Sequence, residues 1–377
     1  MIRIKDIAIT ADILNKISEI DKFNSSWNVD GLRLSPAELT SMKRVATIES
    51  VGSSNRIEGN KLSDAEIEEL FSHISKKSFR SRDEEEVAGY SDLINTIFEN
   101  YEDIALSENY IKQLHKILLK YSQKDERHRG EYKKASNSVA AYDEAGNEIG
   151  VIFQTAAPFD TPRLMRELLQ WTKDTFNDRY LHPLLTIGVF IVHFLAIHPF
   201  TDGNGRLSRA LTILLMLKNN YGYMPYASME SVIEANKEAY YKALHDTQKT
   251  IGSEKTDYEP WLSFFITALQ KQKRALEAKI KNLQKPDTHL TSSLQVLPTH
   301  AALTQVSSTQ LSSVQLSATA REILSVFTEK EELTMAELIE KTKKNAGTIR
   351  KSVQNLVKKG FLIKLGTTQG ASYTLKK

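Results

Sequence analysis

The sequence predicts a mainly α-helical protein that carries a small α+β domain at its C-terminal end. Three observations support this fold class. Helix-starting signals precede apolar stripes along most of the first 284 residues, and a single β-hairpin pattern interrupts them at 138–154. Residues 318–377 follow the order of three helices and then two short strands. A chain of 377 residues is long enough for two or three domains with cores of their own.

Capping signals place the first helices. Ser35-Pro36-Ala37-Glu38 combines a capping box with a proline at the first helical position, and Gly59 can end the helix just after Glu58. A second capping box, Ser63-Asp64-Ala65-Glu66, starts the next helix, and Thr161-Pro162 starts another. Further helices are expected at about 183–197, 205–217, 228–249 and 258–284.

Two segments of this helical region have patterns of their own. The longest apolar stretch runs from Leu184 to Phe200, and its glycine and histidines indicate a buried core helix rather than a membrane span. Residues 138–154 place β-branched and aromatic side chains on both sides of Ala145-Gly146-Asn147, which predicts a hairpin. Because an isolated hairpin is marginally stable, we expect it to lie on a helix.

We interpret the chain as four parts. Residues 1–60 form an N-terminal helical segment, and residues 61–284 form the helical core. Residues 285–317 contain 12 Ser or Thr among 33 residues and are interpreted as a linker. Residues 318–377 predict a winged helix-turn-helix domain, with helices at about 318–328, 334–342 and 346–359 and strands at Phe361–Leu365 and Ser372–Leu375.

Basic charge is concentrated in this last domain. The net charge is +3, yet residues 341–377 hold ten Lys or Arg and no acidic residue. The helix at 346–359 is expected to expose polar groups suited to phosphate and base-edge contacts, so DNA is a candidate partner of 318–377. Those groups are Thr348, Arg350, Lys351 and Gln354, followed by Lys358, Lys359 and Lys364. A protein partner or a dimer contact is the alternative.

Composition also excludes several kinds of chemistry. The chain has no cysteine, which excludes disulfides, thiolate catalysis and iron–sulfur clusters. The first residues are charged where a signal peptide needs an apolar run. We therefore expect a cytoplasmic protein with no membrane partner.

One 12-residue segment, His198 to Arg209 (His-Pro-Phe-Thr-Asp-Gly-Asn-Gly-Arg-Leu-Ser-Arg), indicates a phosphate site. Gly203 and Gly205 allow backbone N–H groups to turn toward an anion just where a new helix begins. Arg206 and Arg209 are three residues apart, so they lie on one side of that helix and can bind a polyphosphate.

Two further residues of the segment are a candidate metal ligand and a candidate general base. Asp202 is a hard oxygen ligand beside the phosphate site, which suits Mg²⁺ bound by one carboxylate and the substrate. An unperturbed histidine titrates near physiological pH, so His198 is a candidate general base.

This segment resembles the signature of the Fic family, His-x-Phe-x-Asp/Glu-Gly-Asn-Gly-Arg-x-x-Arg, at every position. The resemblance implies a helical core with a β-hairpin flap. It also implies transfer of AMP from ATP to a Ser, Thr or Tyr hydroxyl of a target protein, with release of pyrophosphate; self-modification is a possible variant. ATP is then the substrate and Mg²⁺ the cofactor.

The resemblance also implies residue roles. His198 would deprotonate the target hydroxyl, Asp202 would hold Mg²⁺, and Phe200 would anchor the segment in the core. The flap would align the target by strand addition. The ATP-binding groups implied are Gly203, Asn204, Gly205, Arg206 and Arg209 at the phosphates, with Tyr240, Tyr241 and Gln248 near the adenine.

A second segment, Ser53 to Asn60, resembles the inhibitory helix of the family, Ser/Thr-x-x-x-Glu-Gly/Asn. Ser54 and Glu58 occupy the matched positions. Glu58 lies in the last turn of a helix, where an anion opposes the helix dipole by roughly 0.3–1 kcal/mol, so it needs a cationic partner. The resemblance implies that this partner is Arg209 and that Glu58 takes the place of the ATP γ-phosphate.

Alternative functions remain open at this point. Relatives of the same fold transfer phosphate or UMP, and some remove AMP. The chain could also be a DNA-binding regulator whose Fic-like core senses a ligand. A P-loop kinase and a zinc protease are excluded because neither Gly-x-x-x-x-Gly-Lys-Ser/Thr nor His-Glu-x-x-His occurs. A homodimer is possible.

Overall fold

The computed structural model describes residues 2–3, 6–28, 34–73, 79–142, 148–284, 323–324, 326–327, 332–342, 346–358, 362–365 and 372–375. The chain divides into two compact units, Met1–Ser292 and Ser293–Lys377. The predicted linker at 285–317 and the turn at 145–147 lie outside the described residues, as does most of the predicted helix at 318–328.

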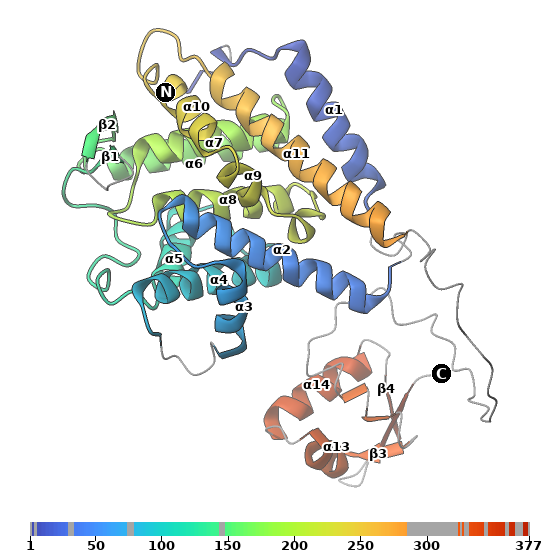
Figure 1. Ribbon diagram of the computed structural model, residues 1–377. Helices are drawn as coiled ribbons and strands as arrows, with labels where there is room; N and C mark the ends of the chain where they lie inside the picture. The colour runs from blue at the N-terminus through green and yellow to red at the C-terminus, as the bar shows by residue number, and fades with distance from the viewer. Residues whose placement is uncertain are drawn as a thin grey trace, which may run out of the picture. The chain divides into compact units, whose positions relative to one another are not determined.

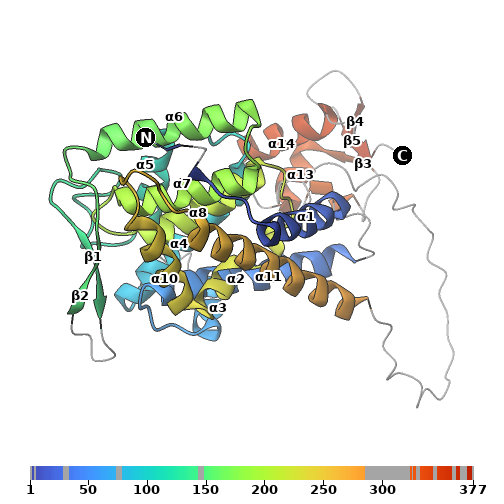
Figure 2. The same ribbon diagram turned by 90° about the horizontal axis from the view of Figure 1, so that it is seen from above.

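The first unit is a helical assembly with one hairpin (Figures 1 and 2). Its helices and strands are α1 (Ala11–Ser26), α2 (Pro36–Ile57), α3 (Asp64–His73), α4 (Arg82–Asn100), α5 (Glu108–Leu118), β1 (Ser138–Tyr142), β2 (Glu148–Gln154), α6 (Thr161–Asp178), α7 (Pro183–Ile197), α8 (Asn204–Lys218), the short 3-10 helix η4 (Met224–Tyr226), α9 (Met229–Glu234), α10 (Lys237–Gln248) and α11 (Glu259–Leu283).

Helix α7 forms the centre of this unit, as its apolar sequence predicted. It packs against α6, α8, α10 and α11, and nearly all of its residues are buried. Gly188 permits the close approach of α11, because a Cβ at this position would lie 2.7 Å from a methyl group of Leu262. Trp261 on α11 donates from its indole to the Gly188 carbonyl at 2.7 Å. The site segment that follows α7 is thus attached to a rigid core helix.

Capping explains several of the helix starts. Ser35 and Glu38 form the predicted capping box at the start of α2, and Ser63 and Glu66 bond reciprocally before α3. Helix α2 packs against α3, α4 and α9, while α1 packs along α11 on another side of the unit (Figure 1). Helices α1, α4 and α5 are additional to those that the sequence patterns single out.

Strands β1 and β2 pair antiparallel as the predicted hairpin. Two register shifts interrupt the pairing, between Val139 and Ala140 and between Ala141 and Tyr142. In both views the hairpin lies at one end of α7 and projects beyond the helices (Figure 2).

The second unit has the predicted order of helices and strands with one addition. It contains β3 (Glu332–Thr334), α13 (Met335–Thr342), α14 (Ala346–Lys358), β4 (Leu362–Leu365) and β5 (Ser372–Leu375). Strand β3 pairs with β5, so the described sheet has the order β3-β5-β4 instead of two strands alone. Three residues are too few to show a strand periodicity, and Thr334 also forms a capping box with Glu337 on α13, which hides the strand signal.

The core of the second unit is separate from that of the first. Ile349, Val353 and Leu356 of α14 are buried in it, as the helical stripe in the sequence predicted. Over the described part of the whole chain, none of the helices combines the length and the apolar character that a membrane crossing requires.

Candidate active site at the junction of α7 and α8

The predicted segment forms the connection between α7 and α8. His198 ends α7 in a left-handed conformation, with φ 52° and ψ 61°, which is uncommon for a residue with a Cβ. Asn204 closes the loop, because its side chain accepts from Phe200 N at 2.9 Å and donates to Phe200 O at 2.7 Å. The side chain of Asn204 therefore holds the loop in shape, and its backbone begins α8.

Phe200 anchors this loop in the core, as the sequence indicated. Its side chain is fully buried and stacks on the imidazole of His115 with the two ring centroids 3.8 Å apart. His115 on α5 accepts from Gly130 N at 2.8 Å through Nδ1, so its Nε2 donates to the carbonyl of Asp202 at 3.0 Å. His115 thus stabilises the loop through its ring contact with Phe200 and its hydrogen bond to the Asp202 carbonyl. Sequence reasoning missed this histidine, because no motif links it to a segment 87 residues away.

His198 is arranged as a neutral base. Its Nδ1 lies 3.3 Å from the carbonyl of Leu195, which can only accept, so Nδ1 carries the proton and Nε2 keeps its lone pair. Burial lowers the pKa of His198 to about 4, and the nearby ammonium of Lys133 acts in the same direction. The imidazole is therefore neutral at neutral pH, with its single proton on Nδ1.

The glycines bring the α8 N-terminus close to a carboxylate of α2. Gly203 adopts a positive φ of 79°, which turns the chain into α8. A Cβ on Gly205 would collide with Oε1 of Glu58. The first turn of α8, where backbone N–H groups lack helical partners, thus already faces an anionic group of the protein.

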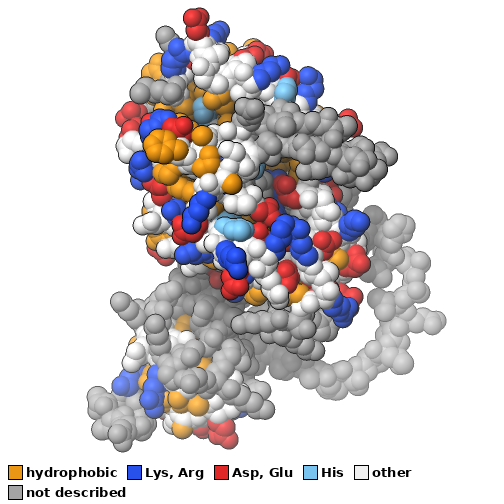
Figure 3. All heavy atoms as spheres, turned by 90° about the vertical axis from the view of Figure 1, so that its left-hand side faces the viewer, with side chains coloured by type: hydrophobic (Ala, Val, Ile, Leu, Met, Phe, Trp, Pro, Cys, Tyr) orange, Lys and Arg blue, Asp and Glu red, His pale blue; other side chains and the backbone are white. Residues whose placement is uncertain are grey.

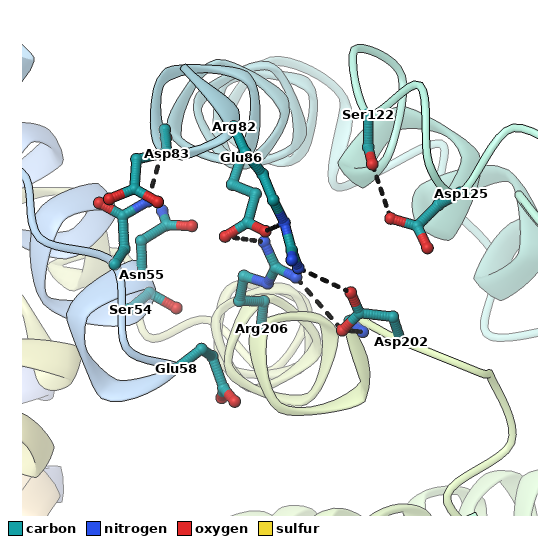
Figure 4. A network of polar contacts seen from close by, with 12 residues as sticks. Ser54, Asn55, Glu58, Arg82, Asp83, Glu86, Ser122, Asp125, Asp202 and Arg206 are labelled. Atoms are coloured by element: carbon teal, nitrogen blue, oxygen red, sulfur yellow. Dashed lines mark hydrogen bonds and ion pairs between the residues drawn. The ribbon is translucent and has the colours of Figure 1, made fainter. Parts of the chain in front are cut away.

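Arg206 lies within a network of two acids and a second arginine (Figure 4). Its guanidinium lies 3.2 Å from a carboxylate oxygen of Glu86 and 3.4 Å from Asp202. Arg82 on α4 bonds to Glu86 at 2.7 Å and lies 3.7 Å from the other Asp202 oxygen. Arg206 is almost completely buried, so these acids also compensate its charge.

Asp202 has the chemistry that a magnesium ligand needs. Burial alone would raise its pKa, but the charge of Arg206 and the N–H of Gly203 hold the pKa of Asp202 below its usual value. The carboxylate is therefore ionised, and it remains about one-third exposed. In the described part of the chain, Asp202 belongs to no group of three or more acidic or histidine ligands. It fits an ion that takes its other ligands from a phosphate substrate and water.

Arg209 and the α2 segment form the second half of the site. Arg209 donates to Oε1 of Glu58 at 2.8 Å, to Ser54 Oγ at 2.8 Å and to the Ser54 carbonyl at 2.8 Å. Burial alone would lower the pKa of Arg209, but the Glu58 carboxylate raises it instead. Glu58 caps the C-terminal end of α2, where its charge opposes the helix dipole, and Arg209 supplies the cation that this position needs.

The three residues assigned to the adenine lie on α10 but differ in surroundings. Tyr240 is buried next to Arg209 and packs on Trp261, and Tyr241 lies near Glu58. Gln248 lies two turns further along and donates to the carbonyl of Val192 on α7 at 3.5 Å. The structure therefore places the two tyrosines beside the Glu58–Arg209 pair and Gln248 against α7.

A buried carboxyl group lies behind this pair. Glu230 on α9 is 1% exposed and accepts from the Tyr90 hydroxyl at 3.1 Å. Burial raises its pKa. The sequence did not point to Glu230, Glu86, Arg82 or His115, because each comes from a helix outside the motif and reaches it only through the fold.

Comparisons with known proteins identify families that two regions of the chain match. Residues 105–216 match the Fic/DOC family, and residues 316–363 match a family described as winged helix-turn-helix DNA-binding. The chain thus carries a Fic/DOC domain followed by a winged helix-turn-helix domain. A curated relative from Aquifex aeolicus, named "Probable protein adenylyltransferase aq_aa38", is 29% identical over 109 residues. That match covers 29% of this chain and 33% of the relative, so it spans about a third of the relative's length.

Solved structures share the fold. A Fic family protein from Desulfovibrio desulfuricans G20 superimposes with a TM-score of 0.58 at 22% identity, and the match covers 98% of each chain. A Fic domain containing signaling protein from Bacteroides thetaiotaomicron VPI-5482 has a TM-score of 0.55 at 23% identity, covering 72% of this chain and 97% of that one. Fic-1 from C. elegans has a TM-score of 0.57 at 17% identity, covering 73% and 74%.

Proposed function

We propose that this protein is a protein adenylyltransferase that is held inactive by Glu58. The observation that carries the proposal is the convergence of a neutral imidazole, an ionised carboxylate and two buried arginines on the α7–α8 junction. These are the groups that phosphoryl-type transfer needs for positioning and charge stabilisation. The name of the Aquifex aeolicus relative supports the same reaction.

In this proposal each group at the α7–α8 junction has one role in the reaction. Nε2 of His198 accepts the proton of the target hydroxyl while the oxygen attacks the α-phosphorus of ATP. The bond from that phosphorus to the bridging oxygen breaks, and pyrophosphate leaves. The first turn of α8 and the two arginines, Arg206 and Arg209, bind the phosphates. Mg²⁺ held by Asp202 would neutralise phosphate charge. The hairpin would hold the target segment through main-chain bonds.

The face of the first unit that lies on the left in Figure 1 carries interspersed acidic and basic side chains over its described part (Figure 3). The target would then be selected by complementary shape and strand pairing rather than by a surface of one charge sign.

Intact mass after incubation with Mg²⁺-ATP tests the proposal. We expect the Glu58→Gly protein to gain the mass of one AMP and His198→Ala in the same background to gain none. ATP binding by calorimetry should persist in the latter, because the imidazole removes a proton and does not hold the nucleotide; loss of a general base typically costs about 10²–10⁴-fold in rate. Full labelling without His198 would overturn its role. A gain of phosphate or UMP mass, or removal of AMP from a labelled protein, would identify the alternative reactions instead.

A second function, DNA binding, is proposed for the winged helix-turn-helix domain. The family match at 316–363 and the exposed side chains of Arg350, Gln354 and Lys364 favour it. Gel retardation of the full chain on random duplex DNA at low salt tests this function. Retardation that weakens steeply with salt is expected, and its complete absence would leave a protein partner as the better interpretation.

A further inference from the structure

Lys133 is a buried lysine outside every motif that the proposed function uses. Its side chain lies just before the hairpin and is 3% exposed. Its ammonium donates to three oxygens, Asn137 Oδ1 at 2.7 Å, Thr155 Oγ1 at 2.8 Å and the Ile197 carbonyl at 3.0 Å. An ammonium group has three donors, so the three acceptors match its capacity.

The three acceptors lie at the two ends of the hairpin and at the residue before His198. Asn137 immediately precedes β1, Thr155 immediately follows β2, and Ile197 immediately precedes His198. One side chain therefore joins both ends of the hairpin to the last residue of α7.

Neighbouring bonds strengthen the same connection. Lys133 N donates to the Pro199 carbonyl at 2.8 Å, and Asn137 Nδ2 donates to the Phe200 carbonyl at 2.9 Å. Two residues after β2, Ala156 N donates to the Ala196 carbonyl at 3.2 Å. The hairpin base is thus hydrogen-bonded along residues 196–200, the stretch that contains His198.

Burial of this ammonium is unfavourable in itself. All three of its acceptors are uncharged, and burial lowers the pKa of Lys133 to about 8. An apolar side chain would fill the space without that penalty. The unfavourable burial is offset by hydrogen bonds that an apolar residue cannot provide. Without the ammonium, the Ile197 carbonyl and Thr155 Oγ1 would lose this donor, and Asn137 Oδ1 would keep only the Thr155 hydroxyl at 2.7 Å.

We propose that Lys133 is a positioning residue that holds the β1–β2 hairpin in a defined place relative to His198 and so aligns the target hydroxyl with its base. This inference rests on the proposed transfer reaction and on the hairpin as the element that holds the target segment. In this proposal Lys133 acts through the hairpin and not by contact with ATP or the reacting atoms.

The test compares Lys133→Met with Lys134→Met, because Lys134 is the next residue and is exposed. Both variants and Lys133→Arg are made in the full chain carrying Glu58→Gly. Hydrogen exchange of the β1 and β2 amides measures the hairpin, calorimetry measures ATP binding, and self-labelling by ATP measures transfer. Thr155→Val removes one acceptor with little change of shape and replaces Lys133→Met if that variant does not fold.

For Lys133→Met we expect hairpin amides to exchange about tenfold faster while amides of α7 and α11 keep their protection. Labelling should fall by about 10–100-fold at saturating ATP, since a displacement of about 1 Å costs this much, with the affinity for ATP unchanged. Lys134→Met should match the parent, and Lys133→Arg should recover part of the rate.

Unchanged hairpin exchange in Lys133→Met would overturn the proposal, as would equal effects of Lys133→Met and Lys134→Met. An increase of exchange throughout the unit would also overturn it, because it would indicate a general loss of stability. If no protein, including the Glu58→Gly parent, labels with ATP, the transfer reaction fails, and the exchange data alone still decide whether Lys133 holds the hairpin.

Discussion

Arg209 on α8 donates a 2.8 Å hydrogen bond to Glu58, which lies 151 residues earlier in the chain at the end of α2. The same guanidinium also binds Ser54, one turn before Glu58. Arg209 is 4% exposed, so a second anion reaches it only by displacing Glu58 or by moving the end of α2. Under the proposed function, Glu58 and a terminal phosphate of ATP would compete for this one cation.

Replacing Glu58 should therefore activate transfer. We expect Glu58→Gly to label itself with ATP at least about tenfold faster than wild type, because freed Arg209 can hold the triphosphate in line. Adding Arg209→Ala should abolish the gain. Glu238→Gln, an exposed acid on α10, serves as the control and should not change the rate. Equal labelling of wild type and Glu58→Gly would reject inhibition by Glu58.

Arg56 attaches the C-terminal part of α2 to α9 and to the start of α3. Its guanidinium binds Glu234 of α9 through two bonds, at 2.7 and 3.0 Å, and Asp64 at 2.9 Å. Glu234→Gln should weaken this attachment by about 1 kcal/mol and raise self-labelling about fivefold. Hydrogen exchange of the last turn of α2 should rise with it. Faster labelling without faster exchange would show that Arg56 does not restrain the helix.

The pH dependence of transfer reports on His198. Because burial lowers its pKa to about 4, from an ordinary value near 6.5, the neutral base persists as the pH falls. The rate of the Glu58→Gly protein should stay level from pH 8 to about pH 5 and decline only nearer pH 4. Single-turnover labelling across this range measures it. A decline centred near pH 6.5 would contradict the buried, neutral state of His198.

Stability should decrease in acid for a related reason. The pKa of His193 is also lowered to about 4 by burial, and its Nε2 lies 2.8 Å from the Tyr258 hydroxyl. Between pH 6.5 and 4 the unfolded state binds a proton that the folded state does not, so the free energy of unfolding falls as the pH falls. Each such histidine contributes up to about 1.4 kcal/mol per pH unit. In His193→Gln, the free energy of unfolding measured in urea should decrease less steeply between pH 6.5 and 4. An unchanged dependence on pH would show that His193 does not contribute to the loss of stability in acid.

Salt dependence should identify the DNA contacts of the second unit. Arg350 is exposed on α14, so Arg350→Ala should lower the slope of log affinity against log salt by about one if this side chain meets a phosphate. Arg163→Ala, an exposed arginine of α6 in the first unit, is the matched control and should leave the slope unchanged. The same slope in both variants would exclude Arg350 from the interface.

The local elements of this protein were predictable where short-range physics decides them. The capping box of Ser35 and Glu38, the all-apolar α7 and the stripe of α14 each carry their signal within a few residues. Strand β3 was missed because three residues hold no period, and the break between α9 and α10 has no proline or glycine to mark it.

The sequence by itself determined which functional groups lie together: His198, Asp202, Gly203, Gly205, Arg206 and Arg209 fall within twelve residues, so the α7–α8 turn and the first two turns of α8 bring them together without long-range contacts. Only the tertiary structure decided which groups meet them. Glu86, His115 and Lys133 come from other segments, and no local rule places them, because packing of helices over long chain separations brings them to the junction. The contact of Glu58 with Arg209 depends on both the sequence and the tertiary structure. Sequence motifs indicate the two residues, and the packing of α2 beside α8 places the carboxylate against the guanidinium.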